Sequence, residues 1–327
     1  MTILVSIQQE VAAWQIPAEQ IARLRAALPE HDVRYATTPA ARAEGLRECD
    51  CLFTWILGAD ELAQAPRLRW VHSSAVAVGT LCLPALAERG IVVTNSRGIQ
   101  ATPIAEHVLA LMLAMTRRLP LALARQQEAR WSQHEFDGPM RPLTLRGQCL
   151  GVVGLGSIGS EVARLAAAFG MDVVAVRRDP TQPVPAGVRA VWGAADLDRL
   201  LAVANVVVLA TPLTGETTAL FDAARLSRMR PGARLVNIAR GPLIDGAALA
   251  EALRSGHLAG AALDVVEHEP LPVDDPLWAA PNLIITPHTS GYRPDHWDDV
   301  VALFVENVRR SDAGQPLLWP VDPARGY

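Results

Sequence analysis

Three polar side chains each follow a short apolar segment in the last third of the chain. The side chains are Arg240, Glu269 and His288, and the segments before them are Leu235–Ile238, Ala261–Val265 and Leu283–Thr286. These segments have the composition of buried parallel strands. Because ligands of open α/β sheets bind beyond the carboxyl ends of the strands, we expect the three side chains to meet at one edge.

A cation, a carboxylate and an imidazole at one edge form the set that reduction of a 2-oxo acid requires. Arg240 can bind the substrate carboxylate and polarise the ketone through its forked donors. His288 carries an imidazole, a side chain suited to general acid catalysis, and can deliver a proton as the carbonyl accepts hydride. Glu269 can accept a hydrogen bond from the other ring nitrogen and so favour the imidazolium. His268 lies in the same loop but not at a strand end, and we leave it out.

A glycine-rich turn of the form GxGxxG directly follows the apolar segment Leu150–Val153 and opens a helical pattern. Its residues are Gly154, Gly156, Ser157, Ile158 and Gly159. The first glycine permits the tight turn, the second lets a pyrophosphate approach the backbone, and the third allows close packing of helix on strand. The amides between the second and third glycines face the anion. This turn predicts a dinucleotide site.

The residues after the next strand, Val173–Val176, bear on the choice of dinucleotide. An acidic residue there holds the ribose 2′-hydroxyl of NAD, but this chain has Arg177 and Arg178. Guanidinium groups suit a 2′-phosphate, so we expect NADP, used as NADPH, to be preferred. The alternative is a solvated basic pair, with Asp179 taking the acidic role and NAD as the cofactor.

The whole chain alternates short apolar strands with helical patterns, which indicates a parallel α/β fold. Its 327 residues suggest two domains. The first hundred residues hold strands expected at Ile3–Ile7, Val33–Tyr35, Cys51–Trp55, Trp70–Ser73 and Ile91–Asn95, and six strands are expected after residue 149. We predict two Rossmann-like lobes with doubly wound parallel sheets. A discontinuous, flavodoxin-like substrate-binding domain takes residues 1–100 and 290–327, and a dinucleotide-binding domain takes residues 101–289. The helix Pro294–Arg310 folds back on the first lobe.

Composition excludes several classes of function. The formal charge is −4, from 30 basic and 34 acidic residues, whereas a nucleic-acid binder usually has a basic surplus. All the basic residues are arginines, so no lysine is present for Schiff-base or phosphate-loop chemistry. The four cysteines show no metal-ligand spacing, and we expect no metal. No signal peptide or membrane span is evident, which predicts a cytoplasmic protein.

The chain resembles the D-isomer-specific 2-hydroxyacid dehydrogenases over nearly its whole length. The segments that carry the resemblance are the glycine turn 154–159, Thr211-Pro212-Leu213-Thr214, Val236-Asn237-Ile238-Ala239-Arg240-Gly241, the stretch 263–272 around Glu269, Thr286-Pro287-His288, and Ala105-Glu106-His107. The resemblance implies a homodimer whose lobes close over NAD(P)H and a small 2-oxo acid, with D-2-hydroxy acids as products. It also implies Arg240, Glu269 and His288 as the catalytic set.

The resemblance adds further site residues. It places Asp264 near the nicotinamide carboxamide and Thr211 and Ala239 against the cofactor, and it assigns substrate-carboxylate binding to the backbone of Val76 and Ala77. The first-lobe loop is less glycine-rich here than is usual in the family. The arginine pair and the compact length are most like glyoxylate/hydroxypyruvate reductases. The alternatives are an NAD-linked enzyme for another substrate, such as 3-phosphoglycerate, and a non-catalytic NAD(P)-sensing regulator.

Overall fold

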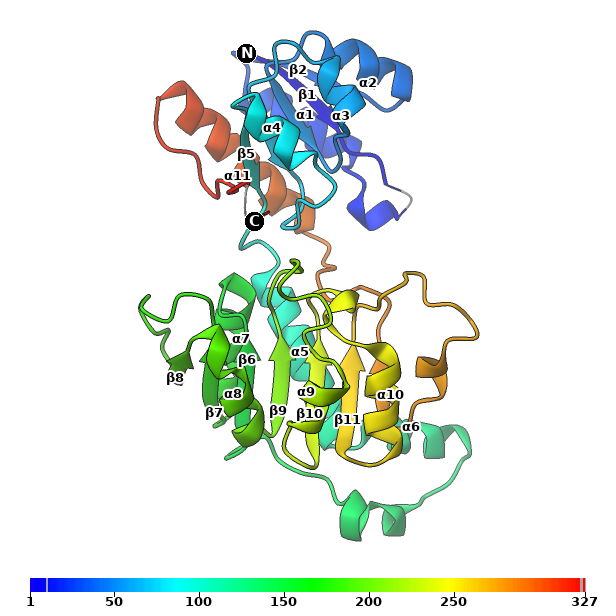
Figure 1. Ribbon diagram of the computed structural model, residues 1–327. Helices are drawn as coiled ribbons and strands as arrows, with labels where there is room; N and C mark the ends of the chain where they lie inside the picture. Colours follow the sequence, from blue (N-terminus) through cyan, green and yellow to red (C-terminus); the bar gives the residue numbers. More distant parts are fainter. Residues whose placement is uncertain (10, 324–325, 327) are drawn as a thin grey trace. The chain divides into compact units, whose positions relative to one another are not determined.

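The computed structural model describes residues 1–9, 11–323 and 326, and the chain divides into two compact units (Figure 1). Unit 1 comprises Met1–Ile99 and Tyr292–Tyr327, and unit 2 comprises Gln100–Gly291. Each unit is a parallel α/β structure with its own sheet, as the alternation of strand and helix patterns predicts.

Unit 1 contains a five-stranded parallel sheet in the order β2-β1-β3-β4-β5. The strands are β1 (Thr2–Ser6), β2 (Asp32–Tyr35), β3 (Cys51–Thr54), β4 (Trp70–Ser73) and β5 (Val92–Asn95). The helices are α1 (Ala18–Ala27), α2 (Pro39–Leu46), α3 (Ala59–Ala63), α4 (Leu83–Glu88) and α11 (His296–Asp312). This order is the flavodoxin-like one, and the sheet is doubly wound as expected.

The C-terminal helix α11 packs on the sheet of unit 1, which confirms that this lobe is discontinuous in sequence. Its buried side chains Val300, Phe304 and Val308 join the apolar core formed by β1, β3 and α1. The side chain of Gln20 on α1 also donates a hydrogen bond to Asp298 at 2.7 Å. An apolar stripe at helical spacing explains why a segment so distant in sequence returns to the first lobe.

Unit 2 contains a seven-stranded parallel sheet in the order β12-β11-β10-β9-β6-β7-β8. The strands are β6 (Cys149–Val153), β7 (Asp172–Val176), β8 (Val188–Trp192), β9 (Val206–Leu209), β10 (Ala233–Asn237), β11 (Leu258–Leu263) and β12 (Leu283–Ile285). Six of them match the predicted strands, and β8 was missed. β8 is a half-exposed strand at the edge of the sheet, where it pairs with β7, so its sequence lacks the continuous apolar run of its neighbours.

Helices cover both faces of this sheet. The α-helices of the unit are α5 (Ala101–Thr116), α6 (Leu119–Gln127), α7 (Ser157–Ala168), α8 (Leu197–Val203), α9 (Ala223–Ser227) and α10 (Gly246–Arg254). One face packs against α5 and α7, and the other against α8, α9 and α10. Among the described residues no single helix is long and apolar enough to cross a membrane, although α5 and α6, bent by 68° at the break between them, pass such a test together.

The strand order of unit 2 reverses between the parallel neighbours β6 and β9: β7 and β8 follow on one side of β6, and β10, β11 and β12 follow on the other side of β9. In Figure 1 the arrows of β9, β10 and β11 point away from α6 and from the segment that follows it. The loops after the carboxyl ends of the strands therefore form one edge of unit 2, and this edge carries the candidate site.

Candidate active site

The glycine turn between β6 and α7 has the geometry that a dinucleotide requires. Gly154 has a φ of +96°, and a Cβ there would lie 2.6 Å from the carbonyl oxygen of Ala210. A Cβ on Gly159 would lie 2.0 Å from the carbonyl oxygen of Gly154, so the helix can pack on the strand only with glycine at that position. Each glycine is therefore fixed by a steric contact rather than by helix propensity.

The middle glycine faces open space. A Cβ on Gly156 would meet no atom within 4 Å, so an outside group can approach the backbone here. Ser157 and Ile158 begin α7, where amides have no intrahelical acceptor. An open backbone at the N-terminus of a twelve-residue helix fits a pyrophosphate. Thr211 lies beside this turn, because a Cβ on Gly154 would also come within 2.8 Å of its amide nitrogen.

The residues after β7 are held by their own loop. Arg177 is half-buried, and its guanidinium donates to the carbonyl oxygen of Pro183 at 3.3 Å and to that of Gln182. Asp179 accepts hydrogen bonds from the amide and hydroxyl of Thr181, and these bonds lower the pKa of its carboxyl group. The Asp179 carboxylate is thus directed toward Thr181 of its own turn.

The turn after β10 fixes the backbone of Arg240. The side chain of the buried Asn237 donates to the carbonyl oxygen of Arg240 at 2.9 Å and accepts from the amide of Ala239 at 3.0 Å. Gly241 must lack a side chain, because a Cβ there would lie 1.9 Å from the carbonyl carbon of Val266 in the loop after β11. The loops after β10 and β11 are therefore in contact, which brings Arg240 toward the loop of Glu269.

Glu269 and His288 form a direct pair. Glu269 Oε2 lies 2.7 Å from His288 Nδ1, and the other carboxylate oxygen accepts from the amide of Val266 at 3.1 Å. The side chains of His288 and Glu269 are 47% and 37% exposed, so the imidazole remains accessible to a substrate. With Nδ1 directed at a carboxylate, the Nε2 atom is the one available to donate a proton to a bound molecule.

Electrostatics link Arg240 to this pair. Burial lowers the pKa of the Arg240 guanidinium, and the negative charge of Glu269 opposes that shift. A partly desolvated cation attracts an anionic substrate group more strongly than a cation in bulk water does. The three side chains predicted at three strand ends are thus brought together at the carboxyl edge of unit 2.

Asp264 at the end of β11 holds the loop that carries His288. Its buried carboxylate accepts hydrogen bonds from Thr286 Oγ1 at 2.6 Å and from the amides of Thr289 and Ser290 at 3.0 Å. Burial alone raises the pKa of Asp264, but these hydrogen bonds outweigh it and hold the pKa below the usual value. Asp264 is therefore ionised, and its carboxylate holds the backbone that follows His288 in place.

His107 on α5 extends this network, and sequence reasoning had given it no role. Its Nε2 lies 3.1 Å from Thr286 Oγ1 and 3.6 Å from Asp264 Oδ1. Asn237 was missed in the same way. Both residues stand inside the segments on which the family resemblance rests, and that was the available signal.

The predicted substrate loop lies in unit 1, after β4. Val76 and Ala77 are half-exposed, and the carbonyl oxygen of Val76 accepts a hydrogen bond from Asn95 at 2.7 Å. Within the described part of the chain, the amides of Val76 and Ala77 have no protein acceptor. The loop thus presents two free N–H donors.

Comparison with known proteins agrees with this geometry. Residues 109–290 match the model of the D-isomer specific 2-hydroxyacid dehydrogenase, NAD binding domain. Glyoxylate reductase of Korarchaeum cryptofilum is 34% identical over 81% of this chain and 80% of its own length. D-3-phosphoglycerate dehydrogenase of Mycobacterium tuberculosis is 36% identical over 88% of this chain but only 52% of its own length.

Among solved structures, a D-isomer specific 2-hydroxyacid dehydrogenase from Xanthobacter autotrophicus Py2, in complex with NADPH and MES, is 34% identical. The match covers 99% of both chains with a TM-score of 0.83. The family model covers more than half of the present chain, and relatives above 30% identity cover most of it. The chain therefore belongs to the D-isomer-specific 2-hydroxyacid dehydrogenases, a family of NAD(P)-dependent oxidoreductases.

Proposed function

We propose that the chain is an NADPH-preferring reductase of small 2-oxo acids, of the glyoxylate and hydroxypyruvate type, that forms D-2-hydroxy acids. The observation that carries this proposal is the 2.7 Å pair of Glu269 and His288 on the edge that also holds Arg240. The glyoxylate reductase relative supports the substrate class, and the NADPH-bound neighbour supports the cofactor.

The proposed chemistry divides among this chain's own residues as follows. When bound, the dihydronicotinamide supplies the hydride. Arg240 binds the substrate carboxylate and polarises the ketone oxygen. His288 donates the proton on Nε2 to the oxygen that becomes the hydroxyl group, while Glu269 holds Nδ1–H and stabilises the imidazolium before transfer. The amides of Val76 and Ala77 are proposed as further donors to the carboxylate.

The remaining proposed roles follow the same edge of unit 2. The glycine turn, with the amides of Ser157 and Ile158, holds the pyrophosphate. Thr211, Ala239 and Asp264 contact the cofactor where the strands end. Arg177 and Arg178 hold the 2′-phosphate, and the engagement of Asp179 with Thr181 supports this assignment because it directs that carboxylate into its own turn.

A panel of 2-oxo acids assayed with NADPH and NADH tests the proposal. We expect turnover of glyoxylate and hydroxypyruvate, and a His288→Asn variant with at most about 1% of the wild-type kcat, since a general acid contributes roughly 10²–10⁴-fold. A His268→Asn variant is the matched control, because His268 is exposed in the adjoining loop, and it should keep its activity.

Other outcomes of the panel decide against the proposal. Turnover confined to the oxidised form of 3-phosphoglycerate would assign the chain to the substrate of its longer relatives. Binding of cofactor with no turnover of any acid would identify a regulatory nucleotide sensor instead.

We also propose that the protein is a homodimer. Three large apolar side chains are exposed on one segment: Leu119 and Leu123 on α6 and Trp131 after it are 47%, 58% and 92% exposed. Apolar side chains that are exposed together mark a surface for contact with another protein. Light scattering should give twice the mass of the 35.1 kDa chain. The mass of one chain at micromolar concentration would rule this out.

A further inference from the structure

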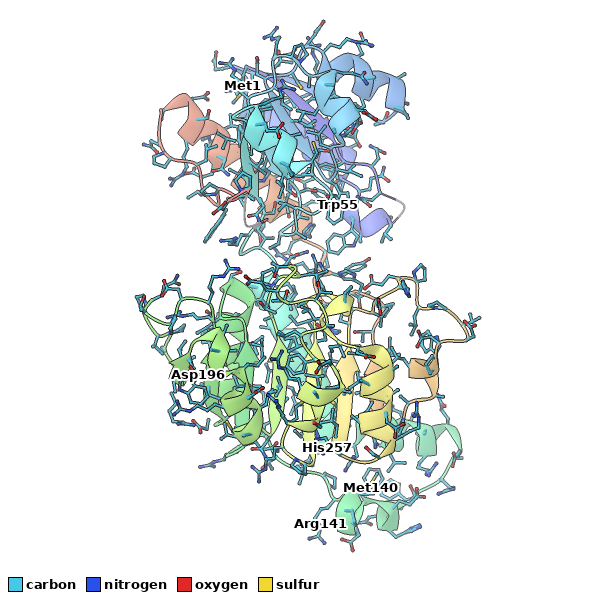
Figure 2. The ribbon with its side chains drawn as sticks, viewed as in Figure 1. Met1, Trp55, Met140, Arg141, Asp196 and His257 are labelled. Carbon is cyan, nitrogen blue, oxygen red and sulfur yellow. The ribbon has the colours of Figure 1, made fainter. Side chains whose placement is uncertain are left out.

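A polar cavity lies in unit 2 at the amino-terminal edge of the sheet, opposite the edge that carries the candidate active site. It has a volume of about 800 Å³. Its lining comes from the residue before β6, the loop before β10 and the segment after α6. Figure 2 labels Arg141 on that segment, below the sheet. None of these residues has a part in the proposed reaction.

The lining of this cavity is strongly basic. It contains five arginines and no aspartate or glutamate: Arg118, Arg141, Arg146, Arg230 and Arg234. We call these residues the arginine pocket. Of the five, Arg141 forms an ion pair, with Asp137, and no carboxylate within the described ranges pairs with the other four. The pocket therefore holds several positive charges that the protein itself does not neutralise.

Arg234 is the most informative member. It is only 4% exposed, yet no protein atom among the described residues accepts a hydrogen bond from its guanidinium. Burial lowers the pKa of Arg234, and the nearby charge of Arg118 lowers it further. A buried, unpaired cation is costly to a fold, and the neighbouring residues of β10, Ala233, Leu235 and Val236, are apolar. An anion from outside the chain would offset this charge.

The backbone explains how the side chain comes to line the pocket. Arg234 begins the regular pairing of β10 with β11, where the register shifts between Ala233 and Arg234. Its amide donates to the carbonyl oxygen of Asn205 at 2.9 Å, and Asn205 also lines the cavity. The backbone at this position is thus held firmly while the guanidinium faces the pocket.

We propose that the arginine pocket binds a small, multiply charged anion, such as a phosphorylated or polycarboxylate metabolite, at a site separate from the catalytic edge. Guanidinium forks match phosphate and carboxylate oxygens in pairs. The volume exceeds that of a single phosphate ion and suits a metabolite-sized ligand. Arg146 and Arg230 are exposed and guide the anion in, and Arg234 receives it at the buried end.

Calorimetric titration of the full chain with inorganic pyrophosphate, at constant ionic strength, tests this proposal. We expect saturable binding that Arg234→Leu weakens at least tenfold. Leucine suits the apolar strand and removes a buried charge, so the variant should fold. The double variant Arg146→Gln/Arg230→Gln changes only exposed residues and should also weaken binding. Arg164→Gln is the matched control, because Arg164 is exposed on α7 and pairs with Glu161, and it should bind as the wild type does.

The glycine turn is a second place where pyrophosphate can bind, so NADPH is titrated into each variant as well. An unchanged NADPH dissociation constant in Arg234→Leu shows that the lost site is not the cofactor site. Pyrophosphate binding that none of the pocket variants weakens would overturn the proposal. Failure of the wild-type chain to bind pyrophosphate would overturn it as well. If Arg234→Leu also had a lower oligomeric mass, the arginines would serve a contact between copies of the chain.

Discussion

Asp264 holds His288 through both its backbone and its side chain. The carbonyl oxygen of Asp264 accepts a hydrogen bond from the amide of His288 at 2.9 Å, and the carboxylate accepts from the next two amides along the chain. His288 has a φ of +54°, in the left-handed region that a side chain other than glycine rarely adopts. The strained backbone of His288 and the two residues after it are therefore held by one buried residue, Asp264.

Replacing that carboxylate should loosen the loop. In Asp264→Asn one acceptor oxygen becomes an NH₂ group that faces amide donors, at a cost of about 1–3 kcal/mol. We expect the Tm to fall by several degrees and kcat to fall at least tenfold, measured by differential scanning fluorimetry and steady-state kinetics. Asp245→Ala is the control, because Asp245 caps α10 through the amide of Ala248 and lies outside the active-site loop. It should lower the Tm with little change in kcat; the same kinetic loss in both variants would contradict the role of Asp264.

The charge of Glu269 should set the upper pH limit of reduction. In Glu269→Gln a hydrogen-bond acceptor remains beside His288 Nδ1, but the negative charge that favours the imidazolium is gone. The proton donor is then lost at lower pH, so the falling limb of kcat/KM against pH should move to lower pH. Glu267→Gln removes the same charge two residues away and should leave the profile unchanged. A profile that does not move in Glu269→Gln would exclude this role for the carboxylate.

The convergence of Arg240, Glu269 and His288 could be predicted from sequence because strand topology alone brings them together. Parallel strands end at one edge, and each of these residues stands just past such an end. The contacts of Asn237 and His107 could not be predicted, because they depend on how loops close on each other. Edge strand β8 was missed for a related reason, since half-exposed residues carry a weak pattern. Sequence fixes position along an element, whereas loop contacts depend on tertiary packing.

Arg177 should decide between the two cofactors. Its guanidinium bonds to carbonyl oxygens of its own loop, which holds a positive charge at the end of β7. Arg177→Asp should weaken the binding of NADPH at least tenfold and the binding of NADH less than threefold, since only NADPH carries a 2′-phosphate. Fluorescence titration of each nucleotide measures both constants. Arg164→Asp makes the same charge change on α7, outside the turn, and should alter neither. Equal weakening of NADPH and NADH in Arg177→Asp would mean that the residue merely supports the loop.

His72 should make unit 1 sensitive to acid. It is fully buried on β4 among Phe53, Trp70 and Phe304; its Nδ1 lies 2.7 Å from Thr94 Oγ1, and its Nε2 has no partner. Burial lowers its pKa to about 3. An unfolded histidine titrates near 6.5, so the unfolded state binds the extra proton first as pH falls. The stability that neutral His72 contributes is complete above about pH 6.5 and is lost toward pH 3, at about 1.4 kcal/mol per pH unit.

Urea unfolding between pH 7 and pH 4.5, followed by circular dichroism, measures this loss. In His72→Asn the amide can replace the contact to Thr94, and although the smaller side chain lowers stability at every pH, the slope of stability against pH should be shallower by close to one proton. His296, whose pKa burial lowers to about 4 with the charge of Arg293 adding to the effect, accounts for part of the slope that remains. His134→Asn, at an exposed position, should leave the slope as it is in the wild type. If the slope in His72→Asn equalled that of the wild type, the imidazole would have to be accessible to protons in the folded state, and acid unfolding would have to begin elsewhere in the chain.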